Sequence, residues 1–292
     1  MKVLVIGGSG FLGSHLVDSL LLKKNSVTVL DLDKSNWLSK NQKFIKADIT
    51  NLKDVLKFTK GFDVIYHCAG LADLDKASKD PLKTVTANIL GTVNILEACK
   101  TNKIKKFIFA STIYVKSLRG GFYRCSKEAC ENYIKEYSNI YNLKYTILRY
   151  GSIYGPRSGL ENGLYKIIYR ALKTKKVVYN GNKNTIREYV HVKDVADISR
   201  DIINKRFDNS TIVLTGQETL KVKDLLIMIK EILGSNYKIQ YSKKNLNSME
   251  KINHYISTPY SYKEDFTKKI KSNQYVDMGQ GIVDLINFIK KN

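Results

Sequence analysis

The stretch Val3-Leu4-Val5-Ile6-Gly7-Gly8-Ser9-Gly10-Phe11-Leu12-Gly13 decides the fold of this chain. Its aliphatic beginning predicts a buried strand, and an apolar-periodic helix follows the glycines. In such a turn Gly7 permits the tight bend, Gly10 lets a pyrophosphate approach the backbone, and Gly13 lets the helix pack on the strand. Because the helix N-terminus also attracts phosphate, the pattern predicts a dinucleotide site, with a purely structural turn as the alternative.

A carboxylate follows the second predicted strand, where the ribose of a dinucleotide is expected. Asp31 closes the run Val27–Leu30, at a distance beyond Gly13 that suits hydrogen bonds to ribose hydroxyls. A carboxylate there repels the 2′-phosphate of NADP, and no Arg stands beside it. The sequence therefore favours NAD as the cofactor, although a solvated Asp31 at a strand end is the alternative.

Short apolar runs alternate with helical patterns through the first half of the chain, which predicts an α/β fold. The predicted strands are Val3–Ile6, Val27–Leu30, Lys43–Ala47, Val64–His67, Lys106–Ala110 and Tyr145–Leu148. We expect a Rossmann-type doubly wound parallel sheet, with an NAD-binding domain over residues 1–150 to which 188–215 return. Residues 151–292, with a helix near Leu160–Leu172, are expected to form mainly a smaller C-terminal substrate-binding α/β region.

A long helix is predicted between the fourth and fifth strands. Asp80 supplies an N-cap and Pro81 occupies the first helical position. Apolar residues then recur every three or four positions, at Leu82, Val85, Ile89, Val93, Leu96 and Cys99. We expect this single stripe to cover the sheet. Such helices also pair across dimer axes, so a homodimer is a secondary expectation.

The charge of the chain favours an anionic ligand over nucleic acid. Its 292 residues carry a formal net charge of +22, but Lys is spread along the whole chain without a dense block. This distribution favours a solvated Lys-rich surface over a nucleic-acid footprint. We therefore expect no nucleic-acid partner, while a positive field would attract a substrate such as a sugar nucleotide.

Several classes of protein are disfavoured by what the sequence lacks. No apolar run approaches the roughly 18 residues that a membrane span requires, and no secretory leader precedes the first strand. We expect a cytoplasmic protein without a membrane partner. Cys68, Cys99, Cys125 and Cys130 form no C-x-x-C pair, so we expect buried free thiols and neither disulfides nor a metal.

A set of three residues in the middle of the chain, Thr112, Tyr123 and Lys127, predicts acid–base chemistry on a hydroxyl or carbonyl group. Tyr123 and Lys127 are four positions apart on a predicted helix, so both side chains lie on one face. A phenol with an ordinary pKa of about 10 needs a nearby cation to act as a base, and Lys127 can supply it. Thr112, at the end of the preceding strand, can hydrogen-bond the reacting oxygen.

These motifs, in this order, resemble those of the extended short-chain dehydrogenase/reductase family, the NAD-dependent epimerases and dehydratases, and most of all the UDP-glucose 4-epimerase group. The similarity extends over residues 1–200. It also includes His67-Cys68-Ala69-Gly70-Leu71, Asn88 with Gly91-Thr92, Leu148-Arg149-Tyr150, Tyr154-Gly155-Pro156-Arg157 and the run from Arg187 to Ala196.

The resemblance implies a role for each candidate residue. The catalytic residues would be Thr112, Tyr123 and Lys127. NAD would contact Gly7, Gly10, Phe11, Leu12, Gly13, Asp31, Asp48, Ile49, Cys68, Ala69, Gly70, Asn88, Tyr123, Lys127 and Tyr150. The nucleoside-diphosphate sugar would contact Thr112, Ser152, Asn162 and Arg187, with the Arg187 fork on the diphosphate.

The chain departs from these relatives at three places, all on the substrate side. The segment from Thr112 to Tyr123 is shorter. Gly151-Ser152 stands where relatives often have Phe-Asn, and the run from His254 to Tyr260 lacks the Arg that usually clasps the nucleotide. The nucleotide and the sugar are therefore left open.

The leading function is an NAD-dependent nucleotide-sugar epimerase that inverts C4 of a nucleoside-diphosphate hexose by transient hydride transfer. Dehydration and decarboxylation are disfavoured, because relatives with those activities carry acidic residues where this chain has Ile113 and Tyr114. A net reductase or dehydrogenase is the enzymatic alternative. A non-catalytic NAD-sensing or RNA-associated protein is the alternative of another class.

Overall fold

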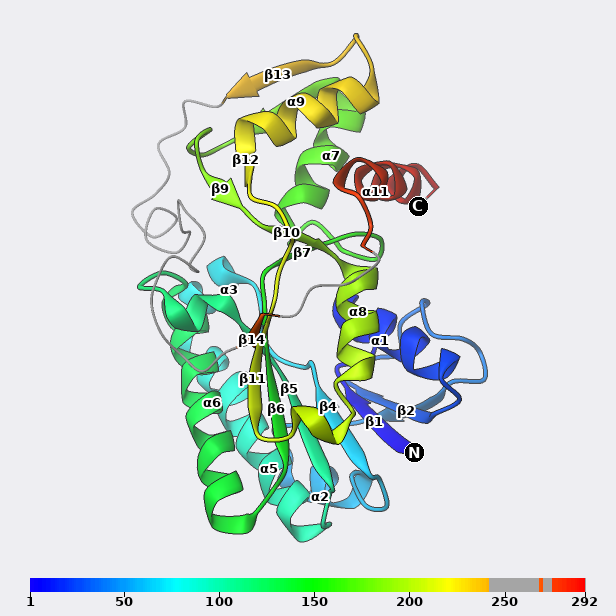
Figure 1. Ribbon diagram of the computed structural model, residues 1–292, viewed down its shortest axis with the longest axis vertical. Helices are drawn as coiled ribbons and strands as arrows, with labels where there is room; N and C mark the ends of the chain where they lie inside the picture. The colour runs from blue at the N-terminus through cyan, green and yellow to red at the C-terminus, as the bar shows by residue number, and fades with distance from the viewer. Residues whose placement is uncertain (242–267, 270–274, 292) are drawn as a thin grey trace.

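The computed structural model describes residues 1–241, 268–269 and 275–291, and it consists of a large and a small lobe (Figure 1). The large lobe contains an eight-stranded sheet in the order β14-β11-β6-β5-β4-β1-β2-β3. Its strands are β1 (Lys2–Ile6), β2 (Ser26–Asp31), β3 (Lys43–Lys46), β4 (Val64–His67), β5 (Lys106–Thr112), β6 (Tyr145–Tyr150), β11 (Ser210–Leu214) and β14 (Lys268–Lys269). Every pair is parallel. The predicted fold class is confirmed.

Helices cover both faces of this sheet, which explains why its central strands are continuously apolar. One face packs on α1 (Phe11–Leu22) and α8 (Val192–Asp201), and the other on α2 (Leu52–Phe58), α5 (Gly91–Thr101) and α6 (Gly121–Tyr141). The strand order reverses between β1 and β4, so a crevice for ligands is expected outside the carboxyl ends of these two strands.

The small lobe lies beyond the carboxyl ends of the strands (Figure 1). Its helices are α7 (Gly163–Thr174), α9 (Val222–Leu233) and α11 (Met278–Lys291). Its strand pairs are β7 (Ser152–Tyr154) with β10 (Tyr189–His191), β9 (Ile186–Arg187) with β12 (Leu220–Lys221), and β8 (Lys176–Tyr179) with β13 (Lys238–Tyr241). The three helices share one apolar core. Because the Asn162 side chain accepts a hydrogen bond from the Tyr165 amide, α7 begins at Gly163 and not near Leu160 as predicted.

The strand boundaries differ from the predicted ones mainly at the functional edge. β5 continues through Ser111 to Thr112, and β6 continues through Arg149 to Tyr150, because these residues pair with each other in register. These four residues are buried, so Thr112 ends β5 as predicted and Tyr150 ends β6. The connecting segments also contain three short helical turns, η2 (Ile113–Lys116), α3 (Leu74–Lys79) and η3 (Lys205–Phe207).

The long helix does not present one stripe to the sheet, as its sequence predicts. α4 (Pro81–Thr84) leads into a π-helical turn, η1 (Val85–Leu90), before α5 begins. A π turn holds more residues than an α turn, so the side chains before it are rotated relative to those after it. Leu96 is therefore fully buried while Leu82 is 81% exposed.

The four cysteines are free thiols, but they are not all buried as predicted, because Cys125 is exposed on the outer side of α6. Within residues 1–241, 268–269 and 275–291, no helix combines the length and the apolar character that a membrane crossing needs.

Candidate active site

The glycine turn between β1 and α1 fits tightly against the end of β4. Gly7 has a φ of +83°, and a Cβ there would lie 2.4 Å from the Ala69 amide nitrogen. A Cβ on Gly13 would lie 2.1 Å from the Gly7 carbonyl oxygen. No larger residue fits either position without backbone movement. The first turn of α1 contains no acidic residue, so its amides face the crevice without a competing carboxylate.

Asp31 ties the end of β2 to this turn. One carboxylate oxygen accepts from the Ser9 amide at 2.9 Å and the other from the Leu32 amide at 2.8 Å. Burial raises the pKa of Asp31, and the two amide hydrogen bonds oppose that shift. Each oxygen keeps a lone pair for a further donor, so the carboxylate can hold a ribose hydroxyl and the loop at once.

Thr112, Tyr123 and Lys127 come together at the carboxyl end of β5. Thr112 ends β5, and its side chain is hydrogen-bonded to the phenol of Tyr123, which comes from the first turn of α6. One turn later, Lys127 Nζ donates to the Ala110 carbonyl at 2.8 Å and lies 4.5 Å from the centre of the Phe109 ring. The structure thus brings Thr112 and Tyr123 into contact, and Tyr123 and Lys127 are four residues apart on α6 as predicted.

The electrostatics of Tyr123 differ from the sequence-based expectation. Burial raises the pKa of Tyr123 to about 12, and the hydrogen bond from Thr112 offsets this only in part. Burial also lowers the pKa of Lys127, whose ammonium is bound to the Ala110 carbonyl. The chain's own groups therefore do not lower the pKa of the Tyr123 phenol toward neutral pH, because the effect of desolvation is larger than theirs.

The loop after β4 connects the glycine turn to the Tyr123 cluster. Gly70 has a φ of +141°, and a Cβ there would lie 2.7 Å from Asn88 Oδ1 and 3.9 Å from Lys127 Nζ. Burial raises the pKa of the neighbouring Cys68 thiol to about 12, so Cys68 is a protonated wall residue and not a nucleophile. Ala69 donates its amide to the Ile6 carbonyl at 3.1 Å.

Asn88, in the π turn, makes hydrogen bonds to two other elements of the site, whereas the family resemblance implied that it contacts the cofactor. Its Oδ1 accepts from the Leu71 amide at 2.7 Å, while its Nδ2 donates to the Leu71 carbonyl at 3.1 Å and to Ser126 Oγ at 2.9 Å. Both amide protons are thereby used. Asn88 thus connects the loop after β4 to α6 next to Lys127, and its cofactor contact stays a prediction.

The remaining cofactor candidates have structural contacts of their own. The Tyr150 hydroxyl lies 2.9 Å from Ser199 Oγ on α8, inside the core. Asp48 Oδ1 accepts from the Thr50 amide and hydroxyl, both at 2.9 Å. Ile49 packs against Gly91. Phe11 and Leu12 are half-buried at the start of α1. These contacts leave the predicted roles at the cofactor open.

The substrate candidates lie where the small lobe meets the sheet. Ser152 begins β7, two residues beyond Tyr150, whose strand partner is Thr112. Asn162 caps α7 and donates to the Ile153 carbonyl at 2.8 Å. Arg187, in β9, is half-buried and donates from Nη1 to the Ile186 carbonyl at 3.0 Å. Contacts within the small lobe thus hold Asn162 and Arg187, and the predicted run from His254 to Tyr260 lies outside the described residues.

Sequence reasoning missed a buried polar group directly beneath the Tyr123 cluster. Glu131 follows Lys127 by four positions and forms a buried ion pair with Arg149, and it also accepts from Ser111 Oγ at 2.5 Å. The signal was present, since Glu131 continues the four-residue spacing of Tyr123 and Lys127 onto the next turn.

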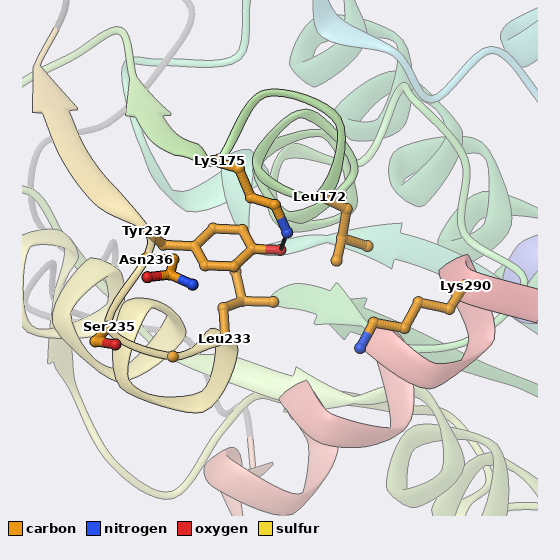
Figure 2. Close-up of a pocket in the computed structure, with 8 residues that line it drawn as sticks. Leu172, Lys175, Leu233, Ser235, Asn236, Tyr237 and Lys290 are labelled. Atoms are coloured by element: carbon orange, nitrogen blue, oxygen red, sulfur yellow. Dashed lines mark hydrogen bonds between the residues drawn. The ribbon is translucent and has the colours of Figure 1, made fainter.

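A cavity of about 530 Å³ in the small lobe is not part of this site (Figure 2). Lys175, Leu233 and Lys290 line it from the carboxyl ends of α7, α9 and α11. Lys175 Nζ donates to the Tyr237 hydroxyl at 2.9 Å. Helix carboxyl ends carry partial negative charge, so Lys175 and Lys290 have an ordinary role at the ends of α7 and α11.

Known proteins share both the sequence pattern and this architecture. Residues 3–214 match the model of the NAD dependent epimerase/dehydratase family. The chain belongs to this family. It is 31% identical to a putative UDP-glucose 4-epimerase of Methanocaldococcus jannaschii, over 99% of both chains. It is 30% identical to the dTDP-D-glucose 4,6-dehydratase of Dictyostelium discoideum over 70% of this chain and 56% of that protein.

The family is NAD-dependent, so the predicted cofactor is confirmed. Among solved structures, the UDP-glucose 4-epimerase of Thermus thermophilus in complex with NAD superimposes with a TM-score of 0.80. It shares 26% identity, and the alignment covers 99% of each chain. Epimerases and dehydratases occur together among these relatives, so the family does not by itself choose between the two reactions.

Replacing Asp31 by Ala is expected to weaken NAD binding about tenfold or more, because a charged acceptor for the ribose and the anchor of the Ser9 amide are lost together. The preference for NAD over NADP should shrink at the same time, since a repulsive charge disappears. Titration calorimetry with both cofactors measures this. Asp33→Ala is the matched control, because Asp33 is exposed and paired with Lys46. Equal affinities of the unaltered protein for NAD and NADP would contradict the role of Asp31.

Proposed function

We propose that this protein is an NAD-dependent nucleotide-sugar epimerase that inverts C4 of a nucleoside-diphosphate hexose. The hydrogen-bonded Thr112–Tyr123 pair carries the proposal, because it lies at the edge of the sheet that also holds the glycine turn, with the buried Lys127 one helical turn further along α6. The relatives named above support the substrate class, since both sequence relatives and the Thermus protein are named for sugar nucleotides.

The residues at this edge fit NAD. Gly7 and Gly13 let the turn pack closely without an intervening side chain, the first turn of α1 offers amides to phosphate, and Asp31 ends β2 as an acceptor. Gly70 likewise lets the loop after β4 lie close to Asn88, since a Cβ there would be 2.7 Å from Asn88 Oδ1. When bound, NAD supplies a hydride acceptor and donor and the positive charge of its nicotinamide ring.

In the proposed reaction Tyr123 takes the proton of the sugar's C4 hydroxyl while the C4 hydrogen leaves as hydride. The resulting 4-keto sugar turns over, the hydride returns to its other face, and Tyr123 gives the proton back. Thr112 orients the reacting oxygen and the phenol through its hydroxyl. Since burial raises the pKa of Tyr123 in the chain by itself, its phenolate form depends on added positive charge, which bound NAD would supply together with the buried Lys127 ammonium.

The small lobe is proposed to supply the substrate contacts. A half-buried Arg187 offers a planar guanidinium that suits the diphosphate. Ser152 stands next to the end of β6, where a hydroxyl can reach the sugar. Asn162 keeps one amide proton beyond its bond to the Ile153 carbonyl, which it could donate to the substrate.

We further propose that the protein is a cytoplasmic homodimer joined through the long helix and α6. Apolar side chains are exposed on both helices, and the π turn of the first packs against the second. The exposed group comprises Leu82, Val85, Leu90, Phe122, Tyr133 and Ile140. Exposed apolar side chains on two helices that pack together favour an interface there.

The reaction is tested by incubating the NAD-loaded protein with UDP-, GDP-, CDP- and dTDP-hexoses, N-acetylhexosamines and uronic acids. Proton NMR of the products should show an inverted C4 centre, with no net change of absorbance at 340 nm, because the two hydride transfers cancel. Tyr123→Phe should abolish turnover and leave NAD affinity nearly unchanged, since only a hydroxyl is removed. Stoichiometric NADH formation or consumption would establish a reductase or dehydrogenase instead, and tight NAD binding without turnover a non-catalytic protein.

Arg187→Ala should weaken binding of the sugar nucleotide by about tenfold to a hundredfold, because a charge-assisted bidentate contact contributes about 1.5–3 kcal/mol. NAD affinity should stay the same. Calorimetric titration of the NAD-loaded protein with the active sugar nucleotide measures the loss, and Arg170→Ala, an exposed Arg on α7, is the control. Unchanged substrate affinity would remove Arg187 from the site.

The dimer is tested by placing charge in its proposed interface. Val85→Asp with Leu90→Asp should convert the protein to a monomer, because carboxylates in an apolar contact cannot be desolvated cheaply. Light scattering coupled to size-exclusion chromatography gives the mass. Leu22→Asp, at an even more exposed apolar position at the end of α1, should leave the dimer intact. A monomeric unaltered protein would refute the interface.

A further inference from the structure

A buried carboxylate joins the three elements that carry the proposed chemistry. Glu131 on α6 accepts from Ser111 Oγ of β5 at 2.5 Å. Arg149 of β6 donates to it twice, from Nε at 3.0 Å and from Nη2 at 2.6 Å. The Glu131 and Arg149 side chains are both 4% exposed. Contacts from α6, β5 and β6 therefore meet on one carboxylate, shielded from water.

The sequence positions of these residues connect the carboxylate to the reacting groups. Ser111 and Arg149 are direct partners across the β5–β6 ladder, and Thr112 is the next residue of β5. On α6, Glu131 follows Lys127 by one turn and Tyr123 by two, so the three side chains lie along the same face. A shift of α6 along or about its axis would move Tyr123 and Lys127 relative to Thr112 and Ala110.

The contacts at Glu131 oppose such a shift. A bidentate guanidinium–carboxylate pair fixes direction as well as distance, and here Ser111 adds a third donor. A buried pair is costly to separate, because each charge would be left without a partner away from water. The helix therefore has one preferred depth and rotation against the carboxyl ends of β5 and β6.

We propose that Glu131 is a positioning residue: through Arg149 and Ser111 it sets the placement of α6 that keeps the Tyr123 phenol on Thr112 and the Lys127 ammonium on the Ala110 carbonyl. The placement follows from the contacts alone, whereas its effect on turnover rests on the function proposed above. The competing view is that the ion pair contributes only to stability.

The placement is tested without turnover, by the Tyr123 signal in NMR spectra of NAD-saturated protein labelled with carbon-13 at the tyrosine ζ position. Tyr123→Phe assigns the signal, and Thr112→Ala gives its position when the hydrogen bond is lost. Glu131→Gln should move the signal toward the Thr112→Ala position. Glu128→Gln, which removes an exposed carboxylate from the same helix, should not move it. A signal at the unaltered position in Glu131→Gln would overturn the proposal.

A charge-balanced variant separates placement from folding. Glu131→Gln leaves Arg149 without a charged partner and can unfold the protein, but Glu131→Leu with Arg149→Leu removes both charges, a change that proteins often tolerate. Thermal unfolding should then be close to that of the unaltered protein, while the Tyr123 signal is still displaced. A stable double variant with an undisplaced signal would show that the ion pair serves stability alone.

Kinetics of the active sugar nucleotide provide the functional arm. Glu131→Gln should lower kcat by about tenfold or more and change KM by less than about threefold, because positioning acts on the reaction and not on binding. In a Thr112→Ala background the same substitution should cost less than about threefold, since its target is already absent. Fully additive losses would contradict the proposal. If no sugar nucleotide turns over, the proposed reaction fails, and the NMR signal alone decides the role of Glu131.

Discussion

All strand pairs of the large sheet are parallel, and the placement of the candidate residues at its carboxyl edge depends on this constraint. Parallel strands end at the same edge, so the glycine turn, Asp31, the loop after β4 and Thr112 are brought together although they are far apart in sequence. Close packing completes the arrangement. The Gly7 backbone lies so near Ala69 that a side chain does not fit between them, which fixes the distance between the ends of β1 and β4.

Local sequence patterns were sufficient to predict most of this edge. The strand–glycine–helix pattern, Asp31, and the spacing of Tyr123 and Lys127 each depend on neighbours within a few residues, and the structure has them as expected. The fold class followed from the alternation of strands and helices, because a sheet buried on both faces needs continuously apolar strands.

Features that depend on tertiary contacts could not be predicted in this way. The π turn that rotates Leu82 outward and aims Asn88 at the loop after β4 has no signature in the apolar spacing. The pKa of Tyr123 depends on how much water the folded chain excludes, which a four-residue motif does not contain. Glu131 could be noticed from its spacing, but its partners come from two strands that only the register brings together.

The path of the chain between the lobes has a consequence for how the molecule unfolds. The backbone leaves the sheet after β6, returns through β10 into α8, leaves again after β11, reaches the sheet once more at β14, and ends in α11 of the small lobe. The apolar cores of the two lobes are therefore connected by several separate passages of the chain from one lobe to the other, which we call crossings, and not by one linker. Neither core can be completed by an uninterrupted piece of chain, so cleavage at a single crossing cannot release a lobe that is intact. Such interleaving favours cooperative loss of both lobes in one transition.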